Sequence, residues 1–207
     1  MMGYILTGGT YSLEKYLPIL EQRLTNFPDQ TDLIMLKEYV KDDRYMQYKM
    51  IARFLPLSQA EGISLLRAFI EDEKGVANLI SEAGEYQVEE LTEVFMEKAK
   101  AYFEDDNFID AAATIFSIVM AIEPELPNEP YQGYIYHCIL ENAFDFLKQI
   151  AANAIDDSIA KQLFKMTEQN WILLNKGNRF YEESWLNLLG DLAAYPQSAH
   201  NIHPNSK

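Results

Sequence analysis

The spacing of the apolar residues is the feature that most limits what this chain can fold into. Over much of the sequence they recur every three or four positions, the period at which side chains share one face of an α-helix. Each apolar face must be covered by a neighbouring element, and no long segment alternates with the period of two that β-strands show. The sequence therefore predicts an all-α fold of packed helices. The runs are Val88, Leu91, Phe95, Ala99 and Tyr102; Phe108, Ala112, Ile115, Val119 and Ile122; Ile135, Ile139, Ala143, Phe146 and Ile150; and, less regularly, Ile159, Leu163, Met166, Asn170 and Leu173.

Helix-breaking and helix-capping residues lie between these runs. Ser58 and Glu61 have the spacing of a capping box, and Pro18 indicates that the first helix is kinked or starts one turn later than its apolar pattern. The breaks fall at Pro28, Pro56, Pro124, Gly177 and Pro196. We predict helices at residues 12–25, 31–41, 44–55, 58–71, 73–83, 86–104, 108–122, 131–153, 157–175 and 179–194.

The predicted helices follow one another through short loops, which makes successive helices antiparallel neighbours. The chain has 207 residues, of which 48% are hydrophobic, as in an ordinary globular protein. We expect a single all-helical domain over residues 1–196 and a polar, flexible tail over 197–207. The antiparallel helix pairs would form either a repeat-like right-handed array or an irregular helical bundle.

The segment from Phe95 to Pro124 has the pattern of two closely packed helices. Ala99 and Ala111 would lie where the helices approach most closely, and Phe108 would be buried under the turn between them. In these features the segment resembles one tetratricopeptide repeat, although Asp106 stands where that family usually has a glycine. The resemblance implies a protein built from helix pairs and, by analogy, a surface that binds a peptide or protein.

The chain is strongly acidic, with 17 Lys and Arg residues against 32 Asp and Glu residues and a net charge of −15. Such a charge repels DNA, RNA and anionic lipid, and the basic residues are scattered singly. We therefore predict no nucleic-acid partner and no membrane partner, and no segment has the ~20 apolar residues of a membrane span. The acidity would serve solubility or, alternatively, attract a basic protein or peptide.

The N-terminal sequence MMGYILTGGTYSLEKY has no basic residue before Lys15 and only a short apolar run, unlike a secretory signal. Cys138 is the single cysteine, so no disulfide can form within the chain. Both features are typical of a cytoplasmic protein, and we predict that location.

Residues that carry out catalysis or bind metals do not form a recognised pattern here. His200 and His203 have a metal-ligand spacing but lack further ligands, and the chain has none of the Glu-x-x-His sequences that di-iron bundles use. Cys138 follows His137, but adjacent helical side chains point about 100° apart, too far for a nucleophile–base pair. We predict no catalytic residue, no cofactor and no bound metal.

Tyrosine is frequent, with 13 residues, and Tyr131, Tyr134 and Tyr136 cluster near the start of one predicted helix. Tyrosine combines a rigid contact area with a hydroxyl group, which suits protein interfaces. We interpret these three residues as candidate partner-binding residues, with ordinary half-buried helix packing as the alternative. The leading hypothesis is a noncatalytic helical scaffold that binds a protein or peptide. The alternatives are a small helical enzyme with a site dispersed in sequence and a self-associating structural subunit.

Overall fold

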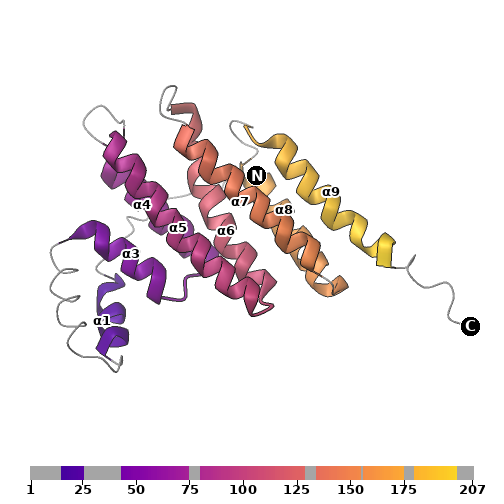
Figure 1. Ribbon diagram of the computed structural model, residues 1–207, viewed down its shortest axis with the longest axis horizontal. Helices are drawn as coiled ribbons and strands as arrows, with labels where there is room; N and C mark the ends of the chain where they lie inside the picture. Colours follow the sequence, from indigo (N-terminus) through magenta and orange to yellow (C-terminus); the bar gives the residue numbers. More distant parts are fainter. Residues whose placement is uncertain are drawn as a thin grey trace, which may run out of the picture.

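The computed structural model describes residues 15–25, 43–74, 80–128, 134–154, 156–174 and 180–199 (Figure 1). Among these residues every regular element is a helix, apart from one isolated antiparallel bridge between Lys74 and Ile80. The predicted all-α fold is therefore confirmed for the described part of the chain. The elements are α1 (Leu17–Thr25), α3 (Arg44–Phe54), α4 (Gln59–Glu73), α5 (Glu82–Glu104), α6 (Phe108–Ile122), the 3₁₀-helix η2 (Glu123–Asn128), α7 (Tyr134–Asn153), α8 (Asp157–Leu174) and α9 (Glu182–Ala199).

The helices pack in two layers. One layer is formed by contacts of α3 with α5, of α5 with α7 and of α7 with α9, and the second by contacts of α4 with α6 and of α6 with α8. Figure 1 shows α5, α7 and α9 side by side, with α6 and α8 lying behind them. Helix α1 packs on α3 at one edge of this array, and α9 lies at the other edge.

Helix α6 lies at the centre of the array, where it contacts α4, α5, α7, α8 and η2. Every side chain from Thr114 to Ile122 is buried, including the hydroxyl-bearing Ser117. A helix that is buried on all sides must be apolar all round, and the sequence of α6 meets that requirement. Among the described residues, no helix is both long and apolar enough to cross a membrane.

The turn between α5 and α6 is closed by backbone hydrogen bonds of the Schellman type. The N–H of Asn107 donates to the carbonyl of Tyr102 (2.8 Å), and the N–H of Asp106 donates to the carbonyl of Phe103 (3.1 Å). Asp106 takes the left-handed conformation that this motif requires, with φ 58°. The Asn107 side chain then caps α6 by accepting from the N–H of Asp110 (3.4 Å).

The helix pair joined by this turn agrees with the sequence prediction except at Phe108. Ala99 and Ala111 are completely buried, on two helices that share an extensive contact, as a close helix crossing requires. Phe108 is only half-buried, so its predicted burial is wrong. Its ring packs edge-on against Phe103, with 5.5 Å between the ring centroids, which leaves part of it exposed beside the turn.

The helix predicted at residues 73–83 is contradicted at Lys74, Ile80 and Ser81, which are not helical, while residues 75–79 lie outside the described part of the chain. The break predicted before residue 86 lies inside α5. Helix α4 ends at Glu73, and α5 begins at Glu82 with Ser81 as its N-cap. Gly84 lies in the first turn of α5, where it marks a close contact rather than a helix end. A Cβ atom on Gly84 would lie 2.7 Å from Cγ2 of Ile80, so only glycine fits there without rearrangement.

The ends of the chain also differ from the prediction. Helix α1 begins at Leu17, so Pro18 occupies its first turn, where a missing N–H costs no hydrogen bond; this is the later start that the sequence allowed. Helix α9 continues through Pro196 to Ala199 instead of ending at residue 194. The predicted helix at 31–41 and the rest of the predicted tail, 200–207, lie outside the described residues.

Candidate partner-binding surface

One end of the array brings together the start of α7, the end of α8 and the start of α9 (Figure 1). His137, in the first turn of α7, lies with Nδ1 2.9 Å from the hydroxyl of Tyr181. Trp171 near the end of α8 and Trp185 in the first turn of α9 have ring centroids 6.1 Å apart. These contacts fix the three helix ends relative to one another.

A buried carboxylate anchors the start of α9 to the centre of the molecule. Glu123, where α6 passes into η2, is 3% exposed. Its Oε2 accepts a hydrogen bond from Nε1 of Trp185 (3.0 Å), and its Oε1 accepts one from the backbone N–H of Tyr181 (3.4 Å). Burial raises the pKa of the Glu123 carboxyl, and the two hydrogen bonds oppose that effect by stabilising the charged form.

Stacked aromatic rings support this end of the array from within. Tyr181 lies parallel to Phe144 at a centroid distance of 5.4 Å, and Trp185 is parallel to Phe116 at 5.6 Å. Burial, with the carboxylates of Glu141 and Glu123, raises the pKa of Tyr181 to about 12. The Tyr181 hydroxyl therefore stays neutral, and it donates a hydrogen bond to the carbonyl oxygen of His137 (3.2 Å).

Large apolar side chains are exposed on the outside of the same end. They are between 52% and 79% exposed, and we call them the end patch: Tyr134, Ile172, Leu173 and Phe180. Single exposed apolar residues are common and need no explanation. Several of them at the ends of α7 and α8 and beside the start of α9 make this end a candidate interaction surface. The rigid aromatic base beneath the end patch holds the helix ends that carry it.

The structure separates the three tyrosines that the sequence suggested. Tyr134 belongs to the end patch and is its most exposed member. Tyr136 is 1% exposed and lies in the hydrophobic core, so its side chain does not reach the surface, and this part of the suggestion is corrected. Tyr131 lies outside the described residues.

Sequence reasoning missed the other members of the end patch. The periodicity of α8 placed Leu163, Asn170 and Leu173 on one buried stripe. The structure buries Leu163 and Asn170, together with Ala160 and Thr167, but leaves Leu173 exposed. Asn170 is held inside because its Oδ1 accepts a hydrogen bond from Nε2 of Gln59 on α4 (2.7 Å).

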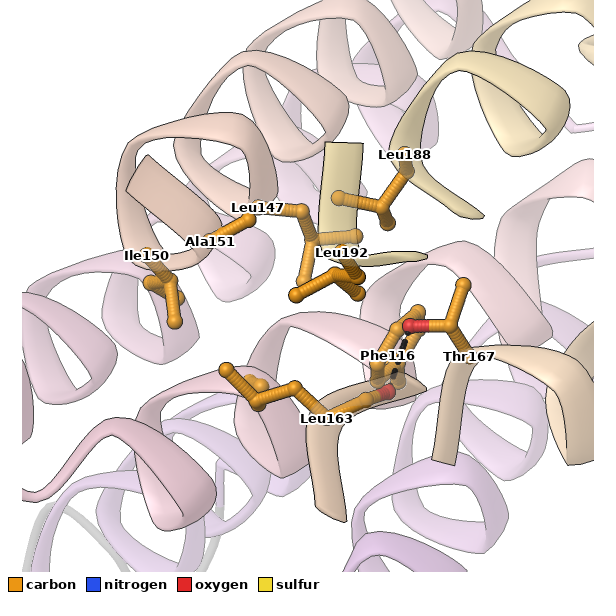
Figure 2. A pocket seen from close by; sticks show the side chains of 9 residues that line it. Phe116, Leu147, Ile150, Ala151, Leu163, Thr167, Leu188 and Leu192 are labelled. Carbon is orange, nitrogen blue, oxygen red and sulfur yellow. Dashed lines mark hydrogen bonds between the residues drawn. The ribbon is translucent and has the colours of Figure 1, made fainter. Parts of the chain in front are cut away.

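A small apolar cavity lies between α6, α7, α8 and α9 (Figure 2). Its volume is about 10 Å³, room for no more than about one water molecule. Figure 2 shows leucine, isoleucine and phenylalanine side chains around it, and the Thr167 hydroxyl donates to the carbonyl of Leu163 (2.8 Å). The cavity is a packing defect rather than a substrate site, because no titratable residue lines it.

The polar groups at this end do not assemble into a metal centre. Across the described ranges, no group of three or more His, Cys, Asp or Glu side chains could hold a metal ion. The fold and this surface define the protein as an all-α, two-layer helical array with an exposed apolar patch at one end. No protein-family model matches the chain, and no curated protein or solved structure is significantly similar to it.

Proposed function

We propose that this protein is a noncatalytic helical scaffold that binds a protein or peptide partner through the end patch. The observation that carries the proposal is the exposure of Tyr134, Ile172, Leu173 and Phe180 at the ends of helices that pack on α9 or beside the start of α9 itself. Removing such side chains from water on binding is favourable by about 25 cal/mol for each Å² of apolar surface. Aromatic anchors such as Tyr134 commonly supply much of the energy of an interface.

The α5–α6 pair supports the analogy with tetratricopeptide-repeat proteins. Its small residues Ala99 and Ala111 are buried, and Asp106 has the left-handed backbone of the position where that family usually has glycine. Proteins built from stacked helix pairs commonly present surfaces for peptides. The proposed scaffold belongs to this structural class and acts in the cytoplasm.

The charge of the chain favours a basic partner. A net charge of −15 attracts cationic segments and accelerates their encounter with the protein. Glu141, Glu168 and Glu183 are exposed on α7, α8 and α9, the helices that carry or adjoin the end patch. The proposed ligand is therefore a segment that combines apolar side chains with lysine or arginine, and its binding should weaken as the salt concentration rises.

The test is comparative affinity capture from native cell lysate, with quantitative mass spectrometry of the bound proteins. The variants are Leu173→Ser with Phe180→Ser, and the matched control is Ile19→Ser, an exposed apolar residue on α1 at the opposite edge. At least one protein should be enriched by the parent and the control and lost, by tenfold or more, from the double variant. If the double variant enriches every partner as well as the parent does, the end patch is not the binding surface.

A further inference from the structure

Helix α3 is basic, although the chain as a whole is strongly acidic. Its sequence, RYMQYKMIARF, contains three basic residues and no acidic residue. Residues 1–55 contain seven basic and seven acidic residues, so the net charge of −15 is carried entirely by residues 56–207. Helix α3 lies with α1 at one edge of the array (Figure 1). A cationic helix therefore packs on the edge of an anionic protein, which attracts it.

Every basic side chain of α3 forms an ion pair with a carboxylate of α4 or α5. In each pair at least one of the two side chains is more than half exposed, so the pairs are open to water and are weakened by salt. The pairs are Arg44 with Asp72 (2.9 Å), Lys49 with Glu90 (3.1 Å) and Arg53 with Glu97 (2.6 Å).

The surface beneath α3 also contacts its apolar stripe and its C-terminal end. The Phe69 ring, which is buried, lies edge-on to the ring of Tyr48 with 5.1 Å between the centroids. Nζ of Lys98 donates to the carbonyl oxygens of Ala52 (2.9 Å) and Leu55, where a cation complements the helix dipole. We call this surface the α3 seat: Phe69 and Asp72 on α4, and Glu90, Glu97 and Lys98 on α5.

The link between α3 and α4 has the features of a hinge. Asp43 caps α3, and Ser58 caps α4 through its capping box with Glu61, so each helix starts without help from the other. Leu55 and Ser58 have extended backbones, and Pro56 lies between them. A few residues between two separately capped helices can absorb a change of direction, so α3 can leave the seat without unwinding α4.

We propose that α3 is an internal ligand that blocks the α3 seat, and that the seat binds a basic amphipathic helix of a partner protein when α3 leaves it. Amphipathic helices commonly bind in grooves through an apolar stripe. The partner helix should present what α3 presents, namely an apolar stripe flanked by cations four residues apart, as Lys49 and Arg53 are. A second copy of this chain is disfavoured, because it would bring its own net charge of −15 to the contact.

Tethering sets how strongly α3 competes with such a helix. A segment joined by a short linker acts at an effective concentration of about 1 mM. An external helix of equal affinity therefore replaces α3 in the parent only near that concentration. Variants that weaken the ion pairs of α3 should admit the external helix at much lower concentrations.

The test uses a fluorescent peptide with the sequence of residues 43–55, capped at both ends, and measures its binding to the full chain by fluorescence anisotropy. In Lys49→Glu with Arg53→Glu, the carboxylates of the seat repel α3. This α3 variant should bind the peptide about tenfold or more tightly than the parent does. Equal binding by the parent and the α3 variant overturns the proposal.

The matched control makes the same change of charge elsewhere. Lys161→Glu with Lys165→Glu replaces two exposed lysines four residues apart on α8. This control should bind the peptide as weakly as the parent does. If it binds as tightly as the α3 variant, the peptide responds to net charge alone and the seat is not the binding site.

Reversing the charge of the seat tests recognition directly. Glu90→Lys with Glu97→Lys should bind a peptide in which Lys49 and Arg53 are replaced by glutamate. It should bind the unchanged peptide about tenfold or more weakly than the α3 variant does. A reversed seat that still binds the unchanged peptide as tightly as the α3 variant overturns the proposal.

Hydrogen exchange of the parent gives a test that needs no variant. A millimolar concentration of the peptide should accelerate amide exchange in α3 and leave exchange in α4 and α5 as slow as before. Unchanged exchange in α3 contradicts the displacement. A parent that instead forms a dimer of twice 23.9 kDa by exchanging α3, seen by sedimentation velocity, would make a second copy the occupant and overturn the partner assignment. The end-patch variant, Leu173→Ser with Phe180→Ser, should respond to the peptide as the parent does, so this proposal and the proposed function can fail independently.

Discussion

Asp106 carries backbone strain at the turn between α5 and α6. Its φ of 58° lies in the left-handed region, which costs most residues about 1–2 kcal/mol and costs glycine nothing. We expect Asp106→Gly to raise the free energy of unfolding by roughly 0.5 kcal/mol, since the greater freedom of glycine in the unfolded chain offsets part of the gain. Urea unfolding measures the effect. Asp105→Gly, at φ −87°, should not stabilise, and an Asp106→Gly variant less stable than the parent would contradict the argument.

Gly62 marks a close contact between α4 and α6. A Cβ atom there would lie 2.6 Å from Oγ of Ser117 and 3.1 Å from Cε1 of Phe95, both of them on well-buried side chains. Alanine normally stabilises a helix relative to glycine by about 1 kcal/mol. Here we expect Gly62→Ala to destabilise instead, by roughly 1–3 kcal/mol, because the core is overpacked.

The control for Gly62 is Gly190→Ala on α9. Because nothing lies within 4 Å of the added Cβ, this variant should gain the usual helix stabilisation. Thermal and urea unfolding of the two variants should therefore move in opposite directions from the parent. If Gly62→Ala stabilises as Gly190→Ala does, α4 and α6 do not pack as closely as described.

At the scale of elements, the attachment of α9 to η2 through Glu123 should depend on pH. Burial raises the pKa of Glu123 above 4.5, so in the interval above 4.5 the folded state binds this proton more tightly than the unfolded state. The stability that the Glu123 carboxyl contributes is therefore fully present below pH 4.5 and is lost as pH rises through the folded pKa. Relative to Glu123→Gln, the parent should lose free energy of unfolding over this interval, measured by urea unfolding at several pH values.

Glu61 provides a control of opposite sign. The backbone and side-chain hydrogen bonds of Ser58 lower the pKa of Glu61, which completes the capping box of α4. The stability that Glu61 contributes should be present above pH 4.5 and lost as pH falls through the folded pKa. The free energy of unfolding of the parent should therefore increase relative to that of Glu61→Gln as pH rises. If both comparisons change in the same direction with pH, the Glu123 carboxyl is not destabilised by burial.

The elements show which parts of the fold the sequence predicts. The apolar stripes of α5, α6 and α7 and the capping box at Ser58 are local patterns, and these helices appear where they were expected. The break predicted between residues 83 and 86 was misplaced, because α5 begins at Glu82 and continues through Gly84. The helix start is set by the Ser81 side chain, which accepts a hydrogen bond from the N–H of Gly84 (3.1 Å).

The candidate site was less predictable for a similar reason. Tyr134 and Tyr136 are two positions apart, so on a helix their side chains point about 200° from each other, and both cannot lie on one surface. That geometry shows that one of the two tyrosines cannot lie on the binding surface, but it does not show which one. Phe180 and Leu173 join Tyr134 only because α7, α8 and α9 meet at one end of the array, which depends on tertiary packing.

At the scale of the whole molecule, the two-layer arrangement predicts a gradient of local stability. Helix α6 is covered by α4, α5, α7 and α8, whereas α1 and α9 lie at the edges. Opening of edge helices exposes less apolar surface than opening of the centre, so their amide hydrogens exchange through smaller openings. We expect native-state hydrogen exchange to be slowest in α6 and faster in α1 and α9.

Variants at the two edges test whether this gradient follows a chain of neighbouring contacts. Trp185→Ala removes a completely buried ring on α9, which costs about 3–5 kcal/mol, and Tyr48→Ala removes a buried ring on α3. In an array in which helices stabilise mainly their neighbours, Trp185→Ala should accelerate exchange in α8 and α9 more than in α3 and α4, and Tyr48→Ala should do the reverse. Equal acceleration in every helix by both variants would show one cooperative unit, and the repeat-like description of the molecule would then fail even though its helices pack in layers.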